Sequence, residues 1–147
     1  MIEEKPPQCG VERFLLLLDG PWATLIVREL LAGPRRFTEL RTVLKGISAH
    51  TLTHRLRRFE KHGLVTRTAF AETPPRVVYE LTPLGLSLRE VLYAMNDWGV
   101  SVPENVLAAP AGEDMTPALV SNMRASRTIC AGLAEPAAHP GGSRKGE

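Results

Sequence analysis

Hydrophobic residues recur at helical spacing through the first part of the chain. Residues 9–18 and 22–32 each carry apolar side chains at i, i+3 and i+4, which is typical of helices with one buried side. An Asp-Gly-Pro step at 19–21 separates the two segments, and a Gly-Pro step at 33–34 follows the second. Glycine tolerates left-handed backbone angles, and proline lacks the donor that would continue a helix. The pattern therefore predicts two helices that end at these steps.

Two further amphipathic segments follow at residues 38–44 and 49–61, with a Lys-Gly-Ile stretch between them. Thr38 and Ser48 are their expected N-caps, because a hydroxyl at that position accepts a hydrogen bond from a free backbone amide. A His-Gly step ends the second segment. Two helices joined by so short a turn are predicted to form a helix-turn-helix.

The segment 49–61 has two different faces. Leu52, Leu56 and Phe59 fall on one side when successive residues turn by about 100°, so this side is predicted to face the core. The opposite side is predicted to carry His50, His54, Arg57 and Lys61. The second helix of the pair therefore presents a polar and positively charged surface.

After this helix the pattern changes to a period of two. Residues 64–68 and 77–81 are rich in β-branched side chains and are predicted to pair as strands around a loop at 69–76. A Thr-Pro step at 82–83 then begins a long helix that runs to about Gly99. The elements predict a mainly α fold with a small β-wing (α+β), which is a winged helix-turn-helix.

Four segments of unequal character divide the 147 residues. We expect a flexible arm at 1–8, a folded domain at 9–99, a C-terminal extension at 100–133 and a disordered tail at 134–147. Within the extension, a Thr-Pro step at 116–117 favours one more helix.

Positive charge is concentrated on the helix-turn-helix. Residues 33–62 hold eight Lys or Arg and two acidic residues, a net charge of +6, whereas the whole chain carries only +2. Three of the four histidines also fall here. Such a local excess is expected where a protein neutralises phosphates, although a solvated basic helix face is the alternative.

These patterns predict binding to double-stranded DNA. Short polar side chains near the start of the reading helix suit base edges in the major groove, where Arg57 binds a guanine or a phosphate. Arg76 in the loop suits the adjacent minor groove, and the remaining arginines suit the phosphates. The expected DNA-contacting set is Thr38, Ser48, His50, Thr51, Thr53, His54, Arg57, Arg58, Arg35, Arg36 and Arg76.

Several motifs occur in a recognisable order. They read ERFLLLLDG, GPWATLIVRELLAGPRRFTEL, GISAHTLTHRLRRFEKHGLV, PPRVVYELTPLG and MNDWG. Over residues 9–99 the chain resembles the HxlR-type winged-helix regulators of bacteria, which are relatives of the MarR type. The resemblance implies a homodimeric repressor on a pseudo-palindromic operator, with the first and last helices as dimerisation helices. The family usually has Gly-Lys-Trp where this chain has Gly-Pro-Trp at 20–22.

The resemblance also implies a sensor role for Cys9, because several relatives sense electrophiles at this position. A helix N-terminus stabilises a thiolate through its unpaired amides, and Arg13 lies one turn further on. The alternative is that Cys9 is an inert residue at a family-typical position. The second cysteine, Cys130, is a candidate partner across a dimer or a residue that faces the core.

Large side chains suggest an effector pocket. Trp22, Tyr93 and Trp98 would line a site for an aromatic small molecule, although residues at this spacing are more often core or dimer packing. His50 and His54 lie one helical turn apart but have no third ligand in sequence, so we expect neither a metal nor a cofactor.

Other functions fit the sequence less well. A winged-helix module that binds protein or RNA is the main alternative to operator binding. An enzyme with Cys9 as its nucleophile would need a base beside the thiol, and the sequence offers none, so we expect no catalysis. The N-terminus lacks a signal peptide and no apolar run reaches the roughly 20 residues that span a bilayer. We therefore expect a soluble, cytoplasmic protein without a membrane partner.

Overall fold

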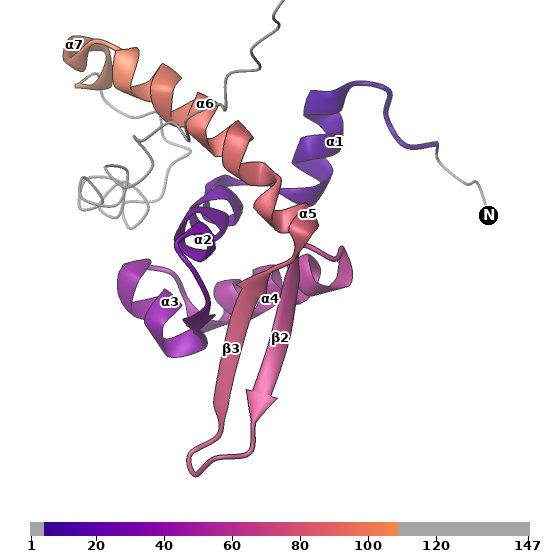
Figure 1. The fold of residues 1–147 in the computed structure, drawn as a ribbon. Helices are drawn as coiled ribbons and strands as arrows, with labels where there is room; N and C mark the ends of the chain where they lie inside the picture. The colour runs from indigo at the N-terminus through magenta and orange to yellow at the C-terminus, as the bar shows by residue number, and fades with distance from the viewer. Residues whose placement is uncertain (1–4, 109–147) are drawn as a thin grey trace, which may run out of the picture.

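A helical body carries a protruding β-hairpin (Figure 1). The computed structural model describes residues 5–108. Its elements, in order, are α1 (Gly10–Leu17), α2 (Pro21–Leu31), β1 (Arg35–Arg36), α3 (Phe37–Val43), α4 (Ala49–Lys61), β2 (Val65–Phe70), β3 (Arg76–Leu81), α5 (Pro83–Leu86), α6 (Leu88–Ser101) and α7 (Glu104–Leu107). This mainly helical fold with a small antiparallel sheet confirms the predicted winged helix-turn-helix.

The apolar sides of α2, α3 and α4 meet in one core. Ile26 of α2, Leu40 of α3 and Leu56 of α4 are all completely buried within it. Leu64 and Leu81, at the base of the hairpin, close the same cluster. Because burial of each such side chain contributes roughly 1.5–3 kcal/mol, this core fixes how α4 sits relative to the wing.

The sheet has the strand order β1-β3-β2, so β2 is an edge strand. The hairpin register runs from Val65 opposite Leu81 to Phe70 opposite Arg76. β1, which the sequence pattern did not predict, adds two residues on the other side of β3. Two residues are too few to show an alternation, which explains why the pattern missed this strand.

The helix caps differ in one place from the prediction. Ser48 caps α4 as expected, since its hydroxyl accepts a hydrogen bond from the Thr51 amide at 3.0 Å. Thr38, in contrast, lies inside α3, whose N-cap is Arg36. The Arg36 amide donates to a Glu39 carboxylate oxygen at 3.0 Å, so a side chain from the first turn satisfies the helix start without a hydroxyl cap.

The long helix expected from residue 83 to residue 99 is two helices, α5 and α6, with Ser87 between them. Gly85 shows how closely α5 packs. A Cβ at Gly85 would lie 2.3 Å from the Leu64 carbonyl oxygen, so α5 is pressed directly against the start of the wing. The Thr82 hydroxyl also caps α5 by accepting from the Gly85 amide at 3.2 Å.

The terminal elements differ from the expected segments. α6 continues to Ser101, and α7 follows within the segment expected to be an extension. The expected helix beyond residue 116, the tail at 134–147, Cys130 and residues 1–4 of the N-terminal arm lie outside the described residues. Within residues 5–108, no helix combines the length and the apolar character that a membrane crossing needs.

The helices α1 and α6 lie at the end of the body away from the wing tip (Figure 1). α1 contains no buried residue, and Leu92 is the one residue of α6 that is buried. Both helices instead expose large apolar side chains, which include Val11, Leu15, Leu16, Val91, Met95 and Trp98. Apolar surface of this kind marks a site of protein contact.

Candidate nucleic-acid interface

The reading helix α4 presents the face that its sequence predicted. His50, His54, Arg57 and Lys61 are all exposed along its outer side. On the inner side, Leu52, Leu56 and Phe59 are at most 1% exposed. The apolar side chains therefore hold the helix in place, and their burial leaves the charged face free to enter a groove.

A broad concavity of about 850 Å³ lies between this helix and the wing. Its walls combine α3, α4 and both hairpin strands, and four of its residues are arginines. The lining residues are Arg36, Phe37, Thr38, Thr53, Arg57, Glu60, Arg67, Glu72, Thr73, Pro74, Pro75, Arg76, Val77 and Tyr79. A surface with this charge and shape suits a polyanion that passes between helix and hairpin.

The concavity brings together only part of the predicted DNA-contacting set. Thr38, Thr53, Arg57, Arg36 and Arg76 all line it. His50 and His54 lie on the exposed outer side of α4, whereas Ser48 and Thr51 are bonded to each other at the helix start. Arg35 lies in β1, at the edge of the sheet.

The wing arginine is folded back on its own hairpin. The Arg76 guanidinium lies 3.0 Å from a Glu72 carboxylate oxygen and 4.3 Å from the centre of the Phe70 ring. An anion that binds Arg76 must therefore compete with Glu72. The predicted entry of Arg76 into a minor groove remains a prediction.

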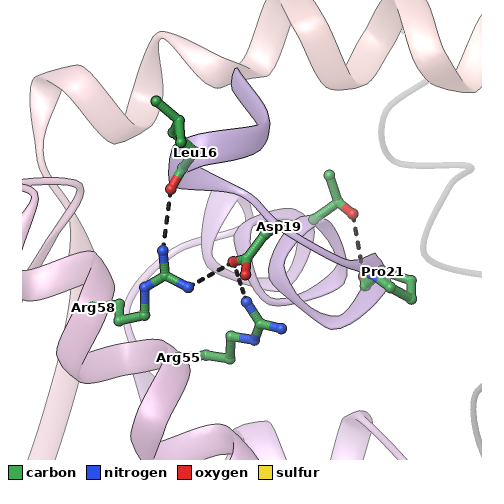
Figure 2. A network of polar contacts seen from close by, with 6 residues as sticks. Leu16, Asp19, Pro21, Arg55 and Arg58 are labelled. Carbon is green, nitrogen blue, oxygen red and sulfur yellow. Dashed lines mark hydrogen bonds and ion pairs between the residues drawn. The ribbon is translucent and has the colours of Figure 1, made fainter. Parts of the chain in front are cut away.

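Two other arginines of α4 point towards the corner between α1 and α2 (Figure 2). Arg55 and Arg58 both donate to one Asp19 carboxylate oxygen, the latter at 2.8 Å. Arg58 also donates to the Leu16 carbonyl oxygen at 3.1 Å. The sequence analysis assigned Arg58 to the DNA backbone, but in the structure its guanidinium is bound within the protein.

Asp19 is charged in this arrangement. Partial burial on its own would raise the pKa of the carboxyl group, but the Arg58 hydrogen bond and the charge and hydrogen bond of Arg55 outweigh that effect. The pKa of Asp19 therefore lies below its usual range. Nothing in the local sequence pattern of residues 19–21 indicated this role, because both partners are more than 30 positions away.

Cys9 is exposed at the N-cap of α1. Arg13, which the sequence placed near the thiol, donates its Nε–H to the Pro7 carbonyl oxygen at 2.6 Å. The structure thus places the cysteine at a helix N-terminus and directs the neighbouring arginine to the backbone.

The three predicted pocket residues do not meet in one cavity. Trp98 helps to line an apolar concavity of about 670 Å³ on α6, together with Val91, Ala94, Met95 and Gly99. Trp22 packs against the core instead, and Tyr93 is half-buried. Within residues 5–108, no three His, Cys, Asp or Glu side chains are grouped so that they could hold a metal ion.

Three charged side chains of the concavity were not among the predicted DNA-contacting residues. Arg67 projects from β2 into it, and Glu60 and Glu72 place two carboxylates among the arginines. The period-two pattern of the hairpin would have placed Arg67 on one face of the strand, but it does not say which face points to the reading helix.

Comparisons with known proteins agree with this geometry. The description HxlR-like helix-turn-helix fits residues 17–106 of the chain. An HTH-type transcriptional regulator of Synechocystis is 44% identical over 91 residues, which are 62% of this chain and 67% of the relative. The fold, the basic face and these matches define a DNA-binding transcriptional regulator of the helix-turn-helix type. The chain belongs to the HxlR-like family, as its motifs indicated.

Solved structures give the same result. The redox regulator HypR in its oxidised form is similar with a TM-score of 0.60 and 34% identity, covering 65% of this chain and 98% of that chain. The reduced form of the regulator YodB from Bacillus subtilis is similar with a TM-score of 0.57 and 33% identity, covering 67% and 98%. These relatives are transcriptional regulators and not enzymes, in agreement with the expectation that the chain has no catalytic role.

Proposed function

We propose that the protein is a homodimeric repressor that binds a pseudo-palindromic operator. The single observation that carries this proposal is the exposed row of His50, His54, Arg57 and Lys61 beside the arginine-lined concavity. An α-helix with such a face fits the major groove, and a hairpin next to it can follow the adjacent minor groove.

Within this interface, side chains have separate tasks. His50, His54 and Arg57 read base edges, since they are exposed on the outer side of α4. Arg36 and Arg76 line the concavity together with Arg57 and suit phosphates or the minor groove. The contacts of Arg36 and Arg76 add affinity without sequence preference, so they are expected to dominate the dependence of binding on salt.

The exposed apolar sides of α1 and α6 support a dimer. Trp98 is 73% exposed and Val11 is 68% exposed, although both are large apolar residues. A second copy of the chain would cover these side chains, and a twofold axis there would direct two reading helices to successive half-sites.

Regulation through Cys9 is the effector hypothesis that the relatives support best. HypR is described as a redox regulator with oxidised and reduced forms, and YodB has also been studied after diamide treatment. In this chain the thiol is exposed at the start of α1, where an adduct or a disulfide would change the dimer contacts. The apolar concavity beside Trp98 is the alternative effector site.

The test is binding to duplexes from the protein's own upstream region, at two salt concentrations, with and without diamide. We expect sequence-specific binding that weakens steeply with salt and is released by diamide in the wild type but not in Cys9→Ser. Arg57→Ala should relax sequence preference, whereas Arg76→Ala should weaken all duplexes alike. Binding that ignores diamide would move the effector to the Trp98 concavity, and absence of specific binding would favour a protein- or RNA-binding module.

A further inference from the structure

The corner between α1 and α2 is held by the reading helix. Arg55 and Arg58 lie one turn apart on α4 and converge on the same Asp19 oxygen (Figure 2). Arg58 uses its second terminal nitrogen for the Leu16 carbonyl, so it grips the end of α1 as well. These three residues, Asp19, Arg55 and Arg58, are called the corner clamp below.

The two arginines of the corner clamp lie off the DNA-facing side of α4. At 3.6 residues per turn, Arg55 falls about 160° and Arg58 about 100° around the helix from Arg57. Both are half-buried, whereas Arg57 is exposed. Neither Arg55 nor Arg58 lines the concavity between helix and wing. Their charges are therefore used inside the protein.

Gly20 shows how closely the corner fits α4. Its φ of +84° lies in the left-handed region that glycine adopts readily, and a Cβ there would come 3.3 Å from an Arg55 terminal nitrogen. The turn after Asp19 thus lets the arginine approach the backbone. Asp19 and Gly20 are adjacent in the sequence, so one dipeptide supplies both the carboxylate that binds the arginines and the turn that lets Arg55 approach.

α1 has few other attachments to the body. It contains no buried residue, although Phe14 and Leu17 are partly buried against the core, and Leu18, just after its end, is buried. In the proposed dimer the exposed side of α1 contacts the second copy, and Cys9 is its N-cap residue. A displacement of α1 would therefore reach α4 through these apolar contacts and through the corner clamp.

We infer that Asp19 is a positioning residue, which with Arg55 and Arg58 couples the orientation of α1 to that of the reading helix. The inference rests on the proposed function, since it concerns how the DNA-reading helix is aimed. It also assigns Arg55 and Arg58 to the scaffold and leaves Arg57 as the exposed arginine of α4 that meets DNA.

The corner clamp predicts that neutralising Asp19 has the opposite effect on specific DNA binding from the one expected from charge alone. Neutralising an acid on a DNA-binding protein ordinarily strengthens binding to every duplex. Asp19→Asn should instead weaken binding to the specific duplex, because α4 loses its fixed orientation. Binding to a scrambled duplex should be unchanged or stronger, because two guanidinium groups are released.

The experiment uses the full chain and two duplexes of equal length and composition. One duplex is selected by the wild-type protein from a random-sequence library, and the other is its scrambled version. Binding of the wild type, Asp19→Asn, Arg58→Lys and Arg57→Ala is measured over a range of salt concentrations. Arg57→Ala is the matched control on the same helix, and circular dichroism verifies that each variant is folded.

We expect the ratio of specific to scrambled affinity to fall about tenfold in Asp19→Asn and in Arg58→Lys, with the salt slope unchanged. A lysine keeps the charge but lacks the two separate terminal nitrogens with which Arg58 reaches Asp19 and the Leu16 carbonyl. Arg57→Ala should also lower this ratio, because Arg57 reads base edges, but unlike Asp19→Asn it should weaken the scrambled duplex as well, since a positive charge is lost. If Arg58→Lys retains the wild-type ratio, or if Asp19→Asn strengthens both duplexes by the same factor, the corner clamp is overturned.

A second measurement separates this inference from the proposed function. If the wild type selects no duplex, the proposed operator binding is rejected. The corner clamp is then tested by hydrogen exchange of the full chain without DNA. Asp19→Asn should accelerate amide exchange at residues 14–18 and in the second half of α4. Exchange that matches the wild type at these amides would overturn the coupling on its own.

Discussion

The helices α4 and α6 have similar lengths, 13 and 14 residues, but they are covered very differently. Each has an apolar side at helical spacing. In α4, Leu52, Leu56 and Phe59 are buried by the rest of the chain. In α6, Met95 is 49% exposed and Trp98 is 73% exposed.

This difference shows which helix is covered by its own chain. The apolar side of α4 is completed by α2, α3 and the base of the hairpin. Within residues 5–108 the apolar side of α6 is largely left exposed, as is much of that of α1. Periodicity predicts that a side is apolar, but it does not distinguish burial within a chain from burial between chains.

The most direct test of this difference in coverage is to truncate one apolar residue on each helix. Leu56→Ala should lower the free energy of unfolding by about 2–5 kcal/mol, because it opens a cavity in a closed core. Met95→Ala, tested in a chain made monomeric by Trp98→Glu, should change it by less than about 1 kcal/mol. Urea unfolding measures both, and equal losses would mean that α6 is as well covered as α4.

Introducing a charged residue on α6 tests the proposed dimer directly. Trp98→Glu should weaken self-association roughly 30-fold or more, since a central aromatic residue in an interface contributes about 2 kcal/mol or more. Sedimentation equilibrium measures the association. Phe70→Ser, which changes an exposed aromatic residue on the wing, is the control and should leave association unchanged.

A smaller effect, on DNA affinity, is expected from a substitution at the wing tip. Glu72→Gln should strengthen DNA binding roughly threefold, because it frees Arg76 from its ion pair and removes a negative charge beside the phosphates. Fluorescence anisotropy with a labelled duplex measures the change. Glu90→Gln on α6 makes the same charge change away from the concavity, and an equal gain there would contradict a local role for Glu72.

The smallest expected effect is the dependence of stability on pH at the corner clamp. Because folding lowers the pKa of Asp19, its ionised form stabilises the fold above about pH 4, and this contribution is lost as the pH falls through the folded-state pKa. The Asp19 side chain is 49% exposed, so the contribution is at most about 1 kcal/mol. Urea unfolding of wild type and Asp19→Asn should therefore differ at pH 7, and the difference should shrink as the pH falls below about 4; a difference that does not change with pH would assign the effect to packing.

Much of the fold was predictable because its signals are local. The Gly-Pro steps, the cap at Ser48 and the two-faced pattern of α4 each occur within a few neighbouring residues. β1 was not predictable, since it depends on pairing with Tyr79 and Val78. The close approach of Gly85 to the Leu64 carbonyl was not predictable either, because the two residues lie about 20 positions apart.

At the site, too, local features could be predicted and long-range contacts could not. The outer face of α4 could be derived from helical geometry, and it is exposed as predicted. The partners of its arginines could not be derived, because Asp19 binds Arg58 from 39 positions away. A count of basic residues therefore does not distinguish those that are bound within the protein from those that are exposed.

The edge position of β2 has one more consequence, for solubility. Within the described residues β2 pairs only with β3, so its other edge leaves backbone groups unpaired on a protruding hairpin. Two such edges that paired antiparallel with Arg67 opposite Arg67 would bring the two guanidinium groups close together, and like charges oppose that pairing. Arg67 thus also helps to keep separate molecules from joining edge to edge into aggregates.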